Sequence, residues 1–137
     1  MNDISPANSW RDEELFLIAE RGHLLHQQGR LQEAAVLFEG LLAIDPRNRY
    51  CAHALAVIRM KTGRAEDAVT LLDRQLAIQP NDDDTRIVRC EALIECGRLD
   101  EARNEWRLLW SRRRDPRLSR LSLRLGVAAP QNRASLR

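Results

Sequence analysis

The chain has 137 residues and a net charge of +2, with 44% apolar and 31% charged residues. This composition is typical of one globular domain or a short repeat array and argues against a disordered chain. No apolar run approaches the roughly 20 residues of a membrane-spanning helix, and residues 1–9 lack the basic start and apolar stretch of a secretory signal.

The first predicted element is a helix that begins near residue 10. Ser9 can accept hydrogen bonds from the free N–H groups of the first turn, and Asp12 places a negative charge at the positive end of the helix dipole. Residues 1–9, ahead of this helix, are expected to form a flexible N-terminus. Leucine and alanine are frequent and aromatic residues make up only 4%, which favours helices throughout the chain.

A 34-residue repeat follows. Glycine recurs at Gly29, Gly63 and Gly97, and each glycine is followed directly by arginine and five positions later by alanine. Asp45-Pro46 and Gln79-Pro80 recur at the same interval. A fixed period of this length predicts a solenoid built from one repeated supersecondary unit.

Within each repeat, the pattern predicts two helices joined by a tight turn. The glycine ends the first helix, since a left-handed residue lets free carbonyl groups be capped, and the proline stops the second helix. An apolar stripe at helical spacing in residues 31–42 indicates a side that faces the core. Small residues on the first helices face alanines on the second helices, which allows close approach: Gly22, Ala56 and Cys90 opposite Ala34, Ala68 and Ala102.

This unit resembles the tetratricopeptide repeat, with repeats at 15–48, 49–82 and 83–116. The resemblance implies an all-α fold, an α-α superhelix (solenoid) of three helix hairpins. The large residue that the family has at position 24 of the repeat is matched here by Phe38, Leu72 and Trp106. Two residues depart from the family pattern, because Arg59 and Arg86 stand where an apolar residue is usual.

An open solenoid exposes an apolar face at its last repeat and needs a cap. Residues 117–126 place Leu118, Leu121 and Leu125 on one helix face and arginines on another, so we expect a C-terminal capping helix there. The repeat domain would then span residues 10–126, and residues 127–137 would form a disordered tail. The third repeat's proline, Pro116, comes two residues later than the period requires.

No catalytic, cofactor or metal site is predicted, and the chain is interpreted as a protein that is not an enzyme. Asp82, Asp83 and Asp84 lie where a helix starts, so N-capping explains them. His23, His26 and His53 lack the spacing of a zinc site. There is neither a phosphate-binding glycine loop nor a nucleophile motif.

Charge and cysteine content bear on partners and on the cell compartment. Residues 1–102 carry 12 basic and 18 acidic groups, whereas residues 103–137 carry 10 arginines and two acidic groups. We interpret Arg112, Arg113 and Arg114 as a solvated helix end in preference to a nucleic-acid site. Three cysteines without a Cys-x-x-Cys pair argue against a disulfide framework, and a cytoplasmic location fits.

The resemblance also implies a site. In tetratricopeptide arrays the first helices line a concave groove through repeat positions 2, 5, 6, 9, 12 and 13. The matching residues would form an apolar and aromatic floor suited to a peptide, helix or strand of a client protein. They are Phe16, Ala19, Glu20, His23, His26, Gln27, Tyr50, His53, Ala54, Val57, Met60, Lys61, Ile87, Val88, Glu91, Ile94 and Glu95, with Asp84 at position 2 of the third repeat. The alternative is that the chain's own termini cover part of this floor.

The size and repeat number are similar to those of the small tetratricopeptide chaperones of type III secretion, which hold translocator proteins or the needle subunit. Residues 90–102 look like their last repeat, and residues 111–118 look like the tail of the needle-subunit type. The resemblance implies a cytosolic chaperone that holds an apolar segment of a secreted client. The alternative is a general scaffold unrelated to secretion. A second copy of the chain or a small co-chaperone is a further partner that this design allows.

A heat-shock co-chaperone is disfavoured. Arrays of that type clamp an acidic C-terminus with lysines and asparagines, whereas Ala19, His23, Ala54, Asp84 and Val88 stand at the matching positions. Lys61 alone cannot bind two carboxylates.

Overall fold

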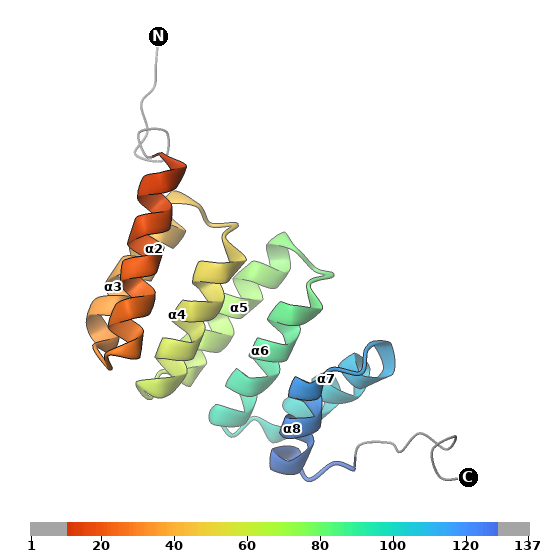
Figure 1. The fold of residues 1–137 in the computed structure, drawn as a ribbon. Coiled ribbons are helices and arrows are strands. Elements are labelled where there is room, and N and C mark those ends of the chain that lie inside the picture. The colour runs from red at the N-terminus through yellow and green to blue at the C-terminus, as the bar shows by residue number, and fades with distance from the viewer. Residues whose placement is uncertain (1–10, 129–137) are drawn as a thin grey trace.

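The predicted all-α superhelix is confirmed. The computed structural model describes residues 11–128, and this part of the chain contains seven helices and no strand (Figure 1). The helices are α2 (Asp12–Gln27), α3 (Leu31–Ile44), α4 (Arg49–Lys61), α5 (Ala65–Ile78), α6 (Asp83–Glu95), α7 (Leu99–Arg112) and α8 (Pro116–Leu125). Among the described residues, no helix is both long and apolar enough to cross a membrane.

The helices pack as three hairpins in a row. α2 packs on α3, α4 on α5 and α6 on α7, and each hairpin also contacts the next one. α8 packs on both α6 and α7, in the place that the first helix of a fourth hairpin would take. Figure 1 shows α2, α4, α6 and α8 in front and α3, α5 and α7 behind them. The molecule therefore has one face made of first helices and one made of second helices.

The repeated small residues form the turns and the close helix contacts that their spacing predicted. Gly29, Gly63 and Gly97 follow the first helices with positive φ angles of 76–77°, a conformation that glycine adopts without strain. A Cβ atom added at Gly22 would lie only 2.8 Å from Cζ of Phe38, so glycine is what lets α2 approach α3. In the third hairpin the Cys90 thiol donates a hydrogen bond to the Ala102 carbonyl at 3.4 Å.

Both ends of the array differ in detail from the predictions. α2 begins at Asp12, two residues after the expected start, and the extended Arg11 is its N-cap residue. The predicted Ser9 cap, the N-terminus 1–9 and the tail from residue 129 onward lie outside the described residues. Pro116 is not the counterpart of Pro46 and Pro80, since α7 already ends at Arg112. Proline instead forms the first turn of α8, where its missing N–H costs nothing.

The two arginines that depart from the family pattern are accommodated by acidic neighbours. Arg59 lies 3.8 Å from Glu39, and Arg86 lies 3.4 Å from Glu105. Arg86 also donates a hydrogen bond to the carbonyl of Pro80 at 2.9 Å. The Nε atoms of both arginines are buried without a hydrogen-bond partner, so the accommodation is incomplete.

Candidate protein-binding surface

The predicted groove residues occupy the face formed by α2, α4 and α6, which we call the inner face. The structure divides these residues by accessibility. Exposed are Phe16, Glu20, Gln27, Tyr50, Lys61 and Glu95. Half-buried are Ala19, His23, His26, His53, Ala54, Val57, Met60, Asp84 and Glu91. Buried are Ile87, Val88 and Ile94. The open part of the inner face therefore belongs to the first two repeats.

Two aromatic side chains stand at the open end of the inner face. Phe16 of α2 and Tyr50 of α4 are 63% and 64% exposed. Both line one pocket between the two helices, and Leu15, Ala19 and Cys51 contribute apolar surface to it. Because apolar groups are costly to leave in water, an accessible pocket with this lining favours contact with another apolar group.

A histidine supports this end of the surface. The His23 ring packs edge-on against Phe38 and Tyr50, with ring centroids 5.1 Å apart in each case. Its Nε2 atom is buried and has no hydrogen-bond partner within the described part of the chain.

A second histidine of α2, His26, contacts the end of α4. Lys61 donates to Nε2 of His26 at 2.8 Å. Burial, followed by the charge of Lys61, keeps the pKa of His26 below its usual value.

His53 ties the second repeat to the third. The Thr85 hydroxyl donates to Asp82 at 2.7 Å, so its oxygen accepts the hydrogen of His53 Nε2, also at 2.7 Å. Asp82 further accepts from Arg49 at 2.9 Å. Burial disfavours the charged imidazolium and lowers the pKa of His53, while the nearby Asp82 carboxylate opposes this shift.

The lowered pKa predicts that unfolding depends on pH. Below pH 6.5 the unfolded chain binds a proton at His53 that the folded chain binds only at lower pH, so stability falls as pH drops from 7.5 to 5.5. His53→Gln should reduce this dependence in urea titrations at the two pH values. The pKa values of Asp82 and Asp84 are lowered too, but these carboxylates lose their stabilising charge only below about pH 4. An unchanged dependence in His53→Gln would contradict the role given to this ring.

The third repeat corrects the predicted groove. Ile87 is 1% exposed, and Val88 and Ile94 are each 9% exposed, so all three belong to the core and not to the floor of an open groove. The physical reason is that α6 packs against α4, α5, α7 and α8, and these side chains join the core that the helices share.

Charged groups remain at this end of the inner face. Glu91 is half-buried, and desolvation raises the pKa of its carboxyl group. Three arginines of α8 oppose that shift, the largest effect coming from Arg117. Glu95 pairs with Arg124 of α8 at 2.6 Å. The C-terminal end of the inner face is therefore polar, in contrast to the aromatic N-terminal end.

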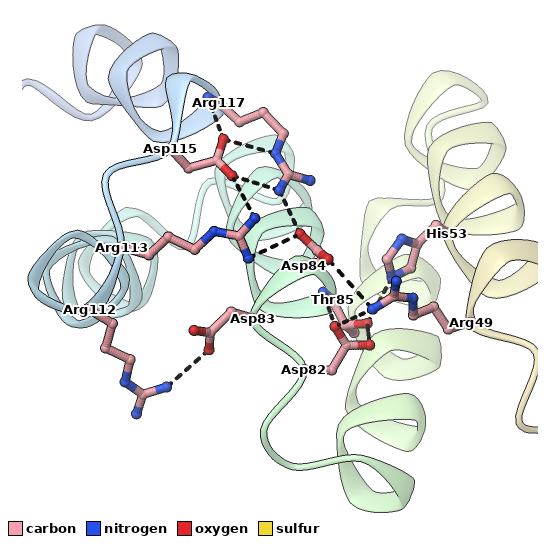
Figure 2. Close-up of polar contacts among 10 residues, drawn as sticks. All are labelled: Arg49, His53, Asp82, Asp83, Asp84, Thr85, Arg112, Arg113, Asp115 and Arg117. Atoms are coloured by element: carbon pink, nitrogen blue, oxygen red, sulfur yellow. Dashed lines mark hydrogen bonds and ion pairs between the residues drawn. The ribbon is translucent and has the colours of Figure 1, made fainter.

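A network of carboxylates and arginines joins α8 to the repeats (Figure 2). Asp82 caps α6, as predicted, by accepting from the backbone N–H of Thr85 at 3.3 Å. Asp84 accepts from Arg117 at 2.6 Å and lies 3.5 Å from Arg49. One carboxylate thus links the start of α6 to α4 and α8.

The basic run that follows α7 is engaged in the same network. Arg112 pairs with Asp83 at 3.0 Å, and Arg113 lies 3.7 Å from both Asp84 and Asp115. The Arg114 guanidinium lies 5.0 Å from the centre of the Trp110 ring. All three arginines remain exposed, as expected of a solvated helix end, and each also has a partner within the protein. The sequence indicated the cap of α6 at Asp82, but it gave no sign that Arg112 and Arg113 pair with the nearby carboxylates.

Helix hairpins of 34 residues stacked into a coil with an accessible inner face define a helical-repeat protein-binding module. Family models described as tetratricopeptide repeat match residues 25–85 and 84–107. The chain belongs to the tetratricopeptide repeat family, whose members are typically non-catalytic interaction modules. Within the described residues, no group of three or more histidine, cysteine or acidic side chains could hold a metal ion.

Two solved structures are similar in fold. One is the first tetratricopeptide domain of Spaghetti (RPAP3) bound to the HSP90 peptide SRMEEVD, at 14% identity and a TM-score of 0.73, covering 85% of this chain and 93% of that chain. The other is PcrH from Pseudomonas aeruginosa, at 21% identity and a TM-score of 0.69, covering 85% and 89%. No curated protein sequence matches the chain.

Proposed function

We propose that the inner face of α2 and α4 binds an apolar segment of a client protein and shields it from water until the client assembles. The observation that carries the proposal is the pair Phe16 and Tyr50, exposed on neighbouring helices around one pocket. Large aromatic side chains that remain exposed in a folded domain favour a role in protein contacts.

The partly buried residues beyond this pair extend the same surface. Ala54, Val57 and Met60 lie along α4 at groove positions and keep part of their surface accessible. The flexible Met60 side chain adapts to a client without a strict shape requirement. An amphipathic helix or an extended segment with two or three apolar anchors would fit such a surface.

The client that we propose is a secreted, self-associating protein of a type III secretion system, held in the cytosol before export. The support is the repeat number and the two short segments that look like this chaperone group. The buried thiols of Cys51 and Cys90 fit a reducing compartment. Neighbouring genes that encode parts of a secretion apparatus would favour this client, and their absence would favour a general scaffold.

Binding of an acidic C-terminal peptide is not supported by the residues present. The RPAP3 domain is similar in fold and holds an HSP90 peptide. On this inner face the only lysine, Lys61, is already bonded to His26. Two carboxylates of a peptide terminus would need further cations at positions where alanine, histidine and valine stand.

The binding test replaces the two exposed aromatics. After co-expression with the proteins encoded by neighbouring genes identifies a client, Phe16→Ala with Tyr50→Ala should weaken its affinity at least about thirtyfold in isothermal titration calorimetry. The control is Val36→Ala with Leu108→Ala, which removes exposed apolar side chains outside the predicted groove positions. Circular dichroism should show unchanged helicity in both variants. Equal affinity of the two double variants would refute the proposed site.

A further inference from the structure

The pocket between α2 and α4, with a volume of about 390 Å³, combines apolar surface with carboxylates. Its apolar side chains include Leu15, Phe16 and Tyr50, and its acidic ones are Asp12, Glu20 and Asp45. Within the described residues, Asp45 accepts a hydrogen bond from the backbone N–H of Arg47 at 3.2 Å, and a carboxylate has room for further donors. The pocket therefore best fits a side chain with a large apolar body and an N–H donor at its edge.

The start of α2 determines how the chain enters beside this pocket. The N-cap residue Arg11 is extended, and its backbone N–H donates to Oε2 of Glu14 at 3.3 Å. Where the third helical residue bonds back to the N-cap in this way, an apolar residue before the cap often packs against an apolar fourth helical residue. These two positions are Trp10, which directly precedes the described residues, and Leu15. Leu15 is half-buried and lines the pocket.

The residue that the helix start directs toward Leu15 also has the chemistry that the pocket fits. The indole of tryptophan has a large apolar surface, and its one polar group is an N–H donor. A phenylalanine or a leucine would fill the apolar part but leave the carboxylates without a donor. Because Trp10 is bonded directly to the N-cap residue, its effective concentration at the pocket is far higher than that of a second copy or another molecule.

We propose that Trp10 occupies this pocket when no client is bound, with its ring on Leu15 and its indole N–H donated to a pocket carboxylate. The chain's own N-terminal segment then shields the surface beside Phe16 and Tyr50, and a client has to displace it. Displacement costs binding free energy, so the segment selects for clients with strong apolar anchors. This competition rests on the proposed function, whereas the position of Trp10 does not.

The test uses nuclear magnetic resonance of the full-length protein without a client. Trp10 is one of three tryptophans, and Trp10→Ala identifies its indole signals by their loss. Tyr50 is the only tyrosine of the chain, so the assignment of its ring signals is unambiguous. We expect nuclear Overhauser effects from the Trp10 ring to the Leu15 methyl groups and to the Tyr50 ring.

Two leucines of the same helix provide matched variants. Leu15→Ala removes the apolar partner and should abolish the contact between Trp10 and Tyr50. Leu17→Ala, at a side chain that is 65% exposed and does not line the pocket, should leave this contact unchanged. Circular dichroism should show that both variants keep their helicity. A contact that persists in Leu15→Ala would contradict the packing that we propose.

Two further results would overturn the position of Trp10. One is a Trp10 ring without contacts to the pocket residues and with an indole N–H that exchanges with water as fast as in a short peptide. The other is a contact that arises only between copies in a mixture of labelled and unlabelled protein, because a second copy would then be the occupant.

The competition has its own measurement. Trp10→Ala should bind the client identified by co-expression at least about threefold more tightly than the unaltered protein, because no binding free energy is spent on displacement. Equal affinity would overturn the competition, while the resonance contacts report on the position of Trp10 without any client. The Phe16→Ala and Tyr50→Ala variant tests the client site itself, so the failure of one proposal is distinguishable from the failure of the other.

Discussion

Replacing Phe38 with alanine is expected to lower the free energy of unfolding by about 3–5 kcal/mol. Phe38 is fully buried in α3, and its ring lies against the backbone of Gly22 and the ring of His23. Removing the ring leaves a cavity between α2 and α3, which the stiff hairpin fills only in part. Urea unfolding followed by circular dichroism measures the loss.

The close approach at Gly22 supplies the matched control. Gly22→Ala should destabilise by about 1–3 kcal/mol, because the new methyl group meets the Phe38 ring. Gly40→Ala, in the same hairpin but facing open space, should stabilise by about 0.5–1 kcal/mol through helix propensity. In the Phe38→Ala background, Gly22→Ala should lose its penalty. Similar effects of the two glycine substitutions in the unaltered protein would show that the helices are not in this register.

The second large effect is expected at Glu105. Its carboxylate is 8% exposed in α7 and lies 3.4 Å from Arg86 and 3.6 Å from Arg89, both of α6. Glu105→Ala would leave Arg86 without its counter-charge, whereas Arg89 would keep only its pair with Asp73 at 2.6 Å. We expect a loss of about 2–4 kcal/mol, below the value for a fully buried pair because both guanidinium groups retain some contact with water.

An exposed ion pair is the comparison for Glu105. Glu101 and Arg98 lie three residues apart at the surface of the same hairpin, and Glu101→Ala should change stability little. Equal effects of Glu105→Ala and Glu101→Ala in thermal unfolding would mean that the buried carboxylate does not hold α6 and α7 together.

The hairpins could be predicted from sequence because their determinants are local. The spacing from Gly29 to Ala34 specifies a turn and the start of a helix, and Asp82 marks a helix N-terminus by its residue type alone. Each of these signals depends on a few neighbouring residues, so no knowledge of tertiary contacts is needed. The fold class and the register of the repeats follow from such signals.

The extent of the inner face could not be predicted in the same way. Ile87 has the residue type and position of a groove residue, but it is buried where α6 packs among α4, α5, α7 and α8. The pairing of Arg112 with Asp83 likewise joins residues that are 29 positions apart. A periodic pattern specifies which side of a helix is apolar but not which segment will cover that side.

Site-specific photo-crosslinking in cells that naturally make the protein tests the proposed use of the inner face most directly. A photoreactive phenylalanine derivative would replace Tyr50 or Val57 on the inner face and, as controls, Val36 or Thr70, which are exposed on second helices. We expect the two inner-face positions to capture the same single protein and the controls to capture none of it. Capture of that protein from Val36 or Thr70 but not from Tyr50 and Val57 would place the client on the opposite side of the array and refute the proposed function.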